Sequence, residues 1–199
     1  MKKYEIGKGV VEVGQGSITN YGADALVCPA NSDLEPVAFP GGVQFAFLMD
    51  GGEDIFEEAR TIAAEYYLNH IEMFGEKGHV PDFSAHLTRA GRLPAKHVIH
   101  SVAVGMKKDG SGLYCNGKVI GESVKNTLNL ANKERLRSIG FPALGTGLYR
   151  VPLEEAVKAM GQQFRTHFAG ETSIERIGLV LYGQEQLEVA RRTLDQIFN

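Results

Sequence analysis

The spacing of apolar residues changes repeatedly along the chain, between the alternation of strands and the longer period of helices. Short apolar or β-branched runs predict strands at 10–13, 25–28, 85–89, 96–104, 138–143 and 176–182. Apolar residues at helical spacing predict helices that begin near 43 and 152 and that cover 54–74, 119–132 and 185–198. Turn-forming residues predict loops at 75–84 and 105–117.

The order of these elements indicates the fold class. The run at 176–182 is almost continuously apolar, which is typical of a strand buried on both faces. Strands and helices alternate over the second half of the chain, which favours an α/β sheet with helices on both faces. The 199 residues contain no internal repeat and no linker, so we predict a single domain over 1–199.

Composition narrows the classes of function. Hydrophobic residues make up 43% of the chain and charged residues 23%, as in ordinary globular proteins. The net charge of −3 argues against a nucleic-acid partner, which usually requires a strongly basic domain. The small basic clusters at Lys107–Lys108 and at Arg135 and Arg137 are therefore interpreted as solvated surface.

The distribution of cysteine and histidine predicts no metal and no cofactor. Cys28 and Cys115 form no CxxC pair, which indicates reduced thiols in a cytoplasmic protein, and Cys28 is interpreted as a small buried apolar residue. His97 and His100 are three residues apart in a predicted strand, so their side chains should point to opposite faces. No signal peptide is visible in 1–15, and no apolar stretch of about 18 residues could span a membrane.

Two glycine-bearing loops follow predicted strands and precede predicted helices. One covers residues 30–43 and ends in Pro40-Gly41-Gly42-Val43, and the other is Gly145-Thr146-Gly147-Leu148-Tyr149. Ligands of α/β sheets bind outside the carboxyl ends of the strands, and glycine lets backbone N–H groups approach an anion. Each loop alone is compatible with an ordinary turn, but the pair predicts a clamp for a diphosphate.

Five segments in register resemble the macrodomain family. They are residues 16–19 (GSIT), 23–32 (ADALVCPANS), 41–43 (GGV), 93–100 (LPAKHVIH) and 141–149 (FPALGTGLY). The resemblance implies a three-layer α/β/α sandwich around a central mixed sheet of about six strands. It also implies binding of ADP-ribose or a related nucleotide.

The resemblance further implies roles for individual residues. Ser17 and Ile18 match the adenine end of the family's site, Asn31 matches the asparagine at the distal ribose, and Tyr182 stands where some relatives stack a ring on adenine. A partly buried tyrosine at a strand end is the alternative for Tyr182. The expected ligand-binding residues are Ser17, Ile18, Ala30, Asn31, Gly41, Gly42, Val43, Gly145, Thr146, Gly147, Leu148, Tyr149 and Tyr182.

Three departures from the family's pattern affect these roles. Ser17 replaces the usual aspartate, and a hydroxyl accepts a hydrogen bond from adenine without the assistance of a charge. Residues 35–40 (EPVAFP) replace part of a glycine run, and their prolines should stiffen the loop. Gln44 stands where hydrolases of the family often have aspartate, and an amide orients a water without accepting its proton.

Two functions therefore remain open at the level of sequence. The first is a hydrolase that removes ADP-ribose or an acyl group attached to it, with Asn31 and Gln44 as the candidate catalytic residues and a ligand phosphate as the proton acceptor. The second is a reader module that binds ADP-ribose, free or on an ADP-ribosylated protein, without chemistry. The glycines of 105–117 add the hypothesis that this loop covers the distal ribose.

Overall fold

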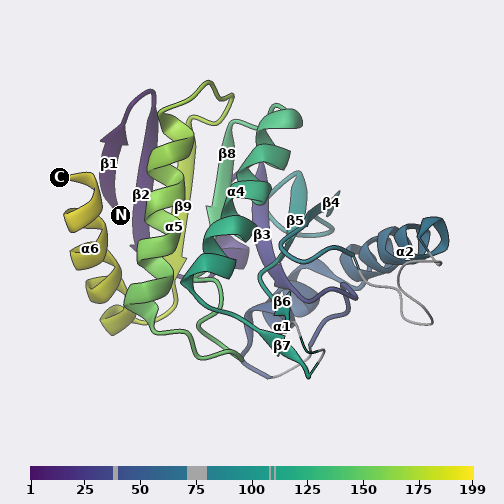
Figure 1. Ribbon diagram of the computed structural model, residues 1–199. Coiled ribbons are helices and arrows are strands. Elements are labelled where there is room, and N and C mark those ends of the chain that lie inside the picture. The colour runs from purple at the N-terminus through teal and green to yellow at the C-terminus, as the bar shows by residue number, and fades with distance from the viewer. Residues whose placement is uncertain (38–39, 71–79, 108, 110) are drawn as a thin grey trace.

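A computed structural model describes residues 1–37, 40–70, 80–107, 109 and 111–199 (Figure 1). Its centre is a seven-stranded sheet in the order β1-β2-β9-β8-β3-β5-β4. The inner strands pair in parallel, and β1 and β4 pair antiparallel at the two edges. The strands of this sheet are β1 (Lys2–Ile6), β2 (Gly9–Gln15), β3 (Ala25–Ala30), β4 (Ala85–Arg89), β5 (His97–Val102), β8 (Ser138–Phe141) and β9 (Arg176–Leu181).

Helices cover both faces of the sheet, which confirms the three-layer α/β/α arrangement. The layer seen in front in Figure 1 consists of α4 (Gly117–Lys133), α5 (Leu153–Phe168) and α6 (Gln184–Phe198). The other face packs against the short 3₁₀ helix η1, the π-helix η2 and the helix α2. These elements and the short α1 are η1 (Ile18–Asn20), α1 (Val43–Ala46), η2 (Phe47–Gly51) and α2 (Asp54–Asn69).

The central strand β3 shows how the sequence builds this core. Its side chains alternate between the two faces: Ala25 and Val27 join the cluster beneath α4 and α5, whereas Leu26 and Cys28 join the cluster beneath η2 and α2. All four side chains are fully buried. A continuous apolar run is therefore required here, because neither face of the strand meets water.

The structure differs from the sequence-based expectation at several elements. The sheet has seven strands instead of about six, because β1 was not predicted; only its Tyr4 is buried, so its apolar signal is weak. The predicted loop at 105–117 contains a small hairpin of β6 (Gly105–Met106) and β7 (Leu113–Tyr114). The helix predicted near residue 43 is a single α-helical turn that continues as the π-helix.

Parts of four predicted segments lie outside the described residues. They are residues 71–74 of the predicted helix 54–74, residues 75–79 of the predicted loop 75–84, residues 108 and 110 of the predicted loop 105–117, and residues 38–39 of the first glycine loop. Among the helices of the described chain, none combines the length and the apolar character that crossing a bilayer requires.

The ring of Tyr21 packs directly on the sheet, on the face that η1 also covers. The ring of Tyr21 lies over Gly140 of β8 and Gly178 of β9, where a Cβ atom would come within 2.6 and 2.3 Å of ring carbons. Its hydroxyl donates to Glu12 Oε2 at 3.0 Å and accepts a hydrogen bond from Arg176. Burial raises the pKa of Tyr21 to about 12, so the phenol stays protonated and donates to the carboxylate. The two glycines therefore provide the space that this tyrosine needs.

Replacing Gly178 should be costly for stability. We expect Gly178→Ala to lower the free energy of unfolding by about 1–3 kcal/mol, because the added methyl group overlaps the Tyr21 ring while the sheet backbone cannot move. Urea denaturation would measure the loss. Gly22→Ala is the matched control, since a Cβ at the exposed Gly22 meets no atom within 4 Å. Equal unfolding midpoints for the two variants would contradict this account of the packing.

Candidate functional site

A cleft of about 840 Å³ lies at the carboxyl ends of the parallel strands β2, β9, β8 and β3. In Figure 1 this edge of the sheet points toward α1, β6 and β7. The volume is within the usual range for a small-molecule site. Every residue that the sequence assigned to the site lines this cleft: Ser17, Ile18, Ala30, Asn31, Gly41, Gly42, Val43, Gln44, Gly145, Thr146, Gly147, Leu148, Tyr149 and Tyr182.

The second glycine loop, residues 145–149, is a compact turn after β8. Gly145 has a φ of +76°, and a Cβ on it would lie 2.8 Å from both Cys115 Sγ and Ile120 Cδ1, so only glycine fits. Thr146 Oγ1 donates to the Ala143 carbonyl at 2.9 Å, and Val151 N donates to the Gly145 carbonyl at 3.1 Å. These contacts fix the loop backbone before any ligand binds.

Gly147 differs from Gly145 in its surroundings. It is exposed, it lines the cleft, and a Cβ on it would meet no atom within 4 Å. The helix α5 begins only at Leu153, and no residue of that helix lines the cleft. The loop itself, and not the helix N-terminus behind it, therefore presents its backbone to the cleft.

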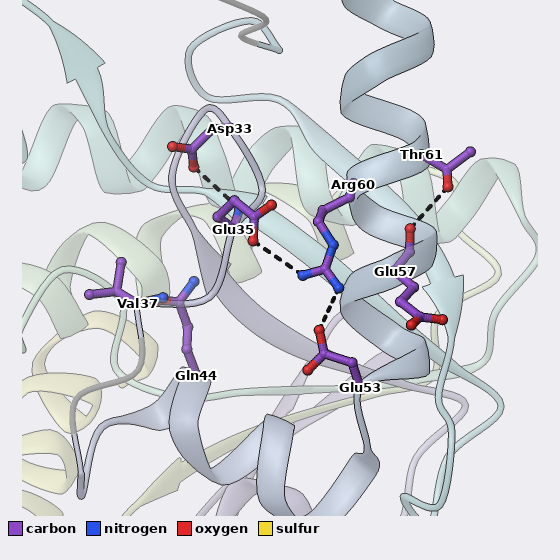
Figure 2. Close-up of polar contacts among 8 residues, drawn as sticks. All are labelled: Asp33, Glu35, Val37, Gln44, Glu53, Glu57, Arg60 and Thr61. Atoms are coloured by element: carbon purple, nitrogen blue, oxygen red, sulfur yellow. Dashed lines mark hydrogen bonds and ion pairs between the residues drawn. The ribbon is translucent and has the colours of Figure 1, made fainter.

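Side-chain and backbone contacts hold residues 31–37 of the first glycine loop in place, and Figure 2 shows several of the side chains. Leu34 adopts a φ of +57° and is buried, and the N–H of Val80 donates to the Ser32 carbonyl at 2.7 Å. Arg60 of α2 donates to Glu35 at 3.2 Å and also pairs with Glu53. The ion pair between Arg60 of α2 and Glu35 thus holds the loop in which residues 35–40 replace part of the family's glycine run.

Gln44 contributes to the same fastening. Its Oε1 accepts a hydrogen bond from the N–H of Val37 at 3.0 Å, as Figure 2 shows. The amide oxygen is therefore engaged with the loop backbone instead of facing a free water. The catalytic role expected for Gln44 stays a prediction, and the structure gives this side chain a positioning contact in addition.

Asn31 presents an unused polar atom at the end of β3. Its Oδ1 is buried and has no hydrogen-bond partner among the described residues. A buried polar atom without a partner is costly unless a ligand or water satisfies it. Because Asn31 lines the cleft, a hydroxyl group of a ligand is a chemically suitable partner.

The lining residues carry little charge. Among the described residues of the lining, none is lysine, arginine or histidine, and Asp50 is the single carboxylate. Burial raises the pKa of Tyr149, which keeps its phenol neutral. An anion in this cleft would therefore have to be held by neutral hydrogen-bond donors, which are the backbone N–H groups of the loops and the hydroxyl and amide groups of the lining.

Tyr182 lies directly after β9 and is 84% exposed. This exposure excludes the alternative of a partly buried strand-end tyrosine. The neighbouring strand β2 ends at Gln15, close to Ser17, so the tyrosine and the serine lie at the same end of the cleft. A flat, exposed ring beside a hydroxyl group suits the stacking and hydrogen bonding of a base.

Residues that the sequence assigned to structural roles have those roles. Cys28 is fully buried, and burial raises the pKa of its thiol. Burial likewise lowers the pKa of His100 to about 3, so this imidazole is neutral, and it packs on Phe56 away from His97. No group of three or more metal-ligating side chains occurs in the part of the chain that the structure describes.

Sequence reasoning missed several lining residues. Leu113 of the β6–β7 hairpin lines the cleft, which keeps that segment near the site as the loop hypothesis required. Met49 and Asp50 also line it, although the apolar run that precedes Asp50 was read as part of a helix. Asp50 accepts a hydrogen bond from Thr19 Oγ1, which is 31 positions away in the sequence. A local sequence pattern cannot predict a contact over that separation.

A mainly parallel sheet covered on both faces, with a cleft at the carboxyl ends of its strands, is typical of α/β proteins that bind a ligand at that edge. The family model described as Macro domain matches residues 27–160, and the chain belongs to that family. The resemblance seen in the sequence is thereby confirmed.

Relatives cover almost the whole chain. An uncharacterized protein of Pyrobaculum aerophilum is 37% identical over 96% of this chain and 97% of its own length. The O-acetyl-ADP-ribose deacetylase of Citrobacter rodentium is 31% identical over 94% of this chain and 96% of its own length. The solved structure of an Oceanobacillus iheyensis macrodomain mutant with ADPR matches with a TM-score of 0.80, at 22% identity, over 98% of this chain and 97% of that chain. This last likeness shows the fold.

Proposed function

We propose that the protein binds ADP-ribose, or a derivative that keeps its diphosphate, in the cleft at the strand ends. The observation that carries the proposal is that both glycine loops line one cleft at the carboxyl ends of the parallel strands. Such a cleft suits a diphosphate held by backbone N–H groups. The solved macrodomain with ADPR has the same fold, which adds support from a relative.

The ligand is proposed to lie across the strand ends from β2 to β3. Its base lies near Ser17 and Tyr182, its diphosphate between the two glycine loops, and its distal ribose near Asn31. The buried and unpartnered Oδ1 of Asn31 supports a hydroxyl group at that end. The same orientation leaves the distal ribose as the point of attachment when ADP-ribose is carried by an ADP-ribosylated protein, the second form of the proposed ligand.

Filling the open side of Gly147 tests this arrangement. We expect Gly147→Val to weaken ADP-ribose binding about tenfold to a hundredfold, because the new side chain displaces the diphosphate and each lost charge-assisted hydrogen bond is worth about 1.5–3 kcal/mol. Isothermal titration calorimetry would give both affinities.

The matched control is Gly22→Val, which adds the same side chain at an exposed glycine outside the cleft where a Cβ also meets no atom within 4 Å. Both variants should keep the wild-type melting temperature within a few degrees. If wild-type protein does not bind ADP-ribose at millimolar concentration, the proposal is wrong. Unchanged affinity in Gly147→Val would reject the position given to the diphosphate.

Hydrolysis of O-acyl-ADP-ribose is a second candidate function. The specific observation in its favour is the full-length relative named O-acetyl-ADP-ribose deacetylase. In this reaction Asn31 orients the distal ribose and water attacks the acyl carbon. A phosphate oxygen of the ligand accepts one proton of the attacking water and passes it to the ribose oxygen as the ester C–O bond breaks, so that ADP-ribose and acetic acid are released, and the acid ionises to acetate in solution. A ligand phosphate is needed because the described cleft lining has no carboxylate near Asn31 and Gln44 is an amide.

The second candidate has its own test. With O-acetyl-ADP-ribose or a mono-ADP-ribosylated protein as substrate, chromatography would follow ADP-ribose release. We expect Asn31→Ala to lower the initial rate about tenfold or more, because the ribose loses its orientation. Asn129→Ala is the control, since Asn129 is exposed on α4. Wild-type turnover no faster than the protein-free background, together with ADP-ribose binding, would reject hydrolysis and leave the binding proposal intact.

A further inference from the structure

We infer that Asp50 determines which base the cleft prefers. It acts through Thr19 on the hydroxyl group of Ser17. As a result, this end of the cleft prefers a base with an amino group over a base with an oxo group. Asp50 would thus be a positioning residue for the base. This inference rests on the proposed binding of ADP-ribose. It gives Asp50 a role at the base, because Ser17 stands in this chain where the family usually has an aspartate.

Three side chains from two segments form a continuous hydrogen-bonded chain. Ser17 Oγ and Thr19 Oγ1 are 2.7 Å apart, and Thr19 Oγ1 donates to Asp50 Oδ2 at 2.6 Å. Ser17 and Thr19 belong to the turn after β2, whereas Asp50 belongs to the π-helix η2. Ser17 and Asp50 both line the cleft, but Thr19 is only 1% exposed, so water does not compete with the link between them.

The direction of each hydrogen bond follows from counting protons. An ionised carboxylate only accepts, so the single hydroxyl proton of Thr19 is committed to Asp50. Thr19 Oγ1 can then only accept from Ser17, which commits the proton of Ser17 as well. Ser17 Oγ therefore faces the cleft with lone pairs alone. The carboxylate strengthens the acceptor, because linked hydrogen bonds polarise one another.

The direction selects among purine bases. Adenine carries an amino group at position 6, which donates a hydrogen bond, whereas guanine and hypoxanthine carry an oxygen there, which accepts one. An acceptor at Ser17 matches the amino group and leaves the oxo group facing lone pairs. The exposed side chains of Met49 and Tyr182 line the same cleft and offer apolar surface to the faces of the base.

A pair of ligands that differ only at position 6 tests the inference. The probes are ADP-ribose and inosine diphosphate ribose, titrated by calorimetry into the full chain. We expect wild-type protein to bind ADP-ribose about tenfold to a hundredfold more tightly, as one charge-assisted hydrogen bond allows. Asp50→Ala and Thr19→Val should reduce this ratio to about threefold or less, because each removes an acceptor from the hydrogen-bonded chain and so frees the hydroxyl proton of Ser17.

Two further variants separate this role from a structural one. Thr19→Ser keeps a hydroxyl group at position 19 and should restore the wild-type ratio. Asp54→Asn removes an exposed carboxylate outside the cleft and should leave the ratio unchanged. General damage to the cleft would weaken both ligands equally, because they share the diphosphate and both riboses, whereas loss of the hydrogen-bonded chain changes their ratio.

The outcomes distinguish this inference from the proposed function. If wild-type protein binds neither ligand, the proposed function fails and the inference fails with it. If ADP-ribose binds but wild-type protein shows no preference, or if Asp50→Ala and Thr19→Val keep the full preference, the inference alone is overturned. Loss of the ratio in these two variants, with its recovery in Thr19→Ser, supports it.

Discussion

The parallel alignment of the inner strands is the constraint on which the site depends. Because β2, β9, β8 and β3 run in the same direction as neighbours, their carboxyl ends meet at one edge of the sheet. Loops that are more than a hundred residues apart in sequence therefore line the same cleft. Tyr21 packs on Gly140 of β8 and Gly178 of β9. This contact holds the turn that carries Ser17 close to two of these strands.

Neither the net charge of the protein nor the side chains of the cleft attract the negatively charged ligand that we propose. The chain has a net charge of −3, and the described lining offers Asp50 but no cation. Long-range attraction therefore contributes little to binding a diphosphate, and the hydrogen-bond donors must be positioned before the ligand arrives. This requirement explains the internal contacts of the loop at 145–149 and the fastening of residues 31–37 by Arg60 and Gln44.

Local patterns predicted the α/β fold class and the two glycine loops, whereas the other expected ligand-binding residues came from the resemblance to the macrodomain family. The continuous apolar run of β9 and the glycines after β8 are visible without a structure. What could not be predicted depends on weak or distant signals. The strand β1 buries only Tyr4, so it lacks a clear alternation, and the short β6–β7 hairpin lies in a glycine-rich segment. The contact between Thr19 and Asp50 joins two segments whose proximity arises only when η2 packs on the sheet.

Two of the three departures from the family's pattern, Ser17 and the shortened glycine run, are matched by contacts from residues 44–60. At the end of the cleft that carries Ser17, hydrogen bonds through Thr19 link this hydroxyl group to the carboxylate of Asp50. At the other end, Gln44 and Arg60 hold a loop that has fewer glycines. Both contacts extend from one stretch of chain, in which the π-helix η2 packs its buried Phe47 beneath the sheet. A change in that packing would shift both ends of the cleft together, so under the proposed function it would alter the affinity for the base and the placement of the ribose at the same time.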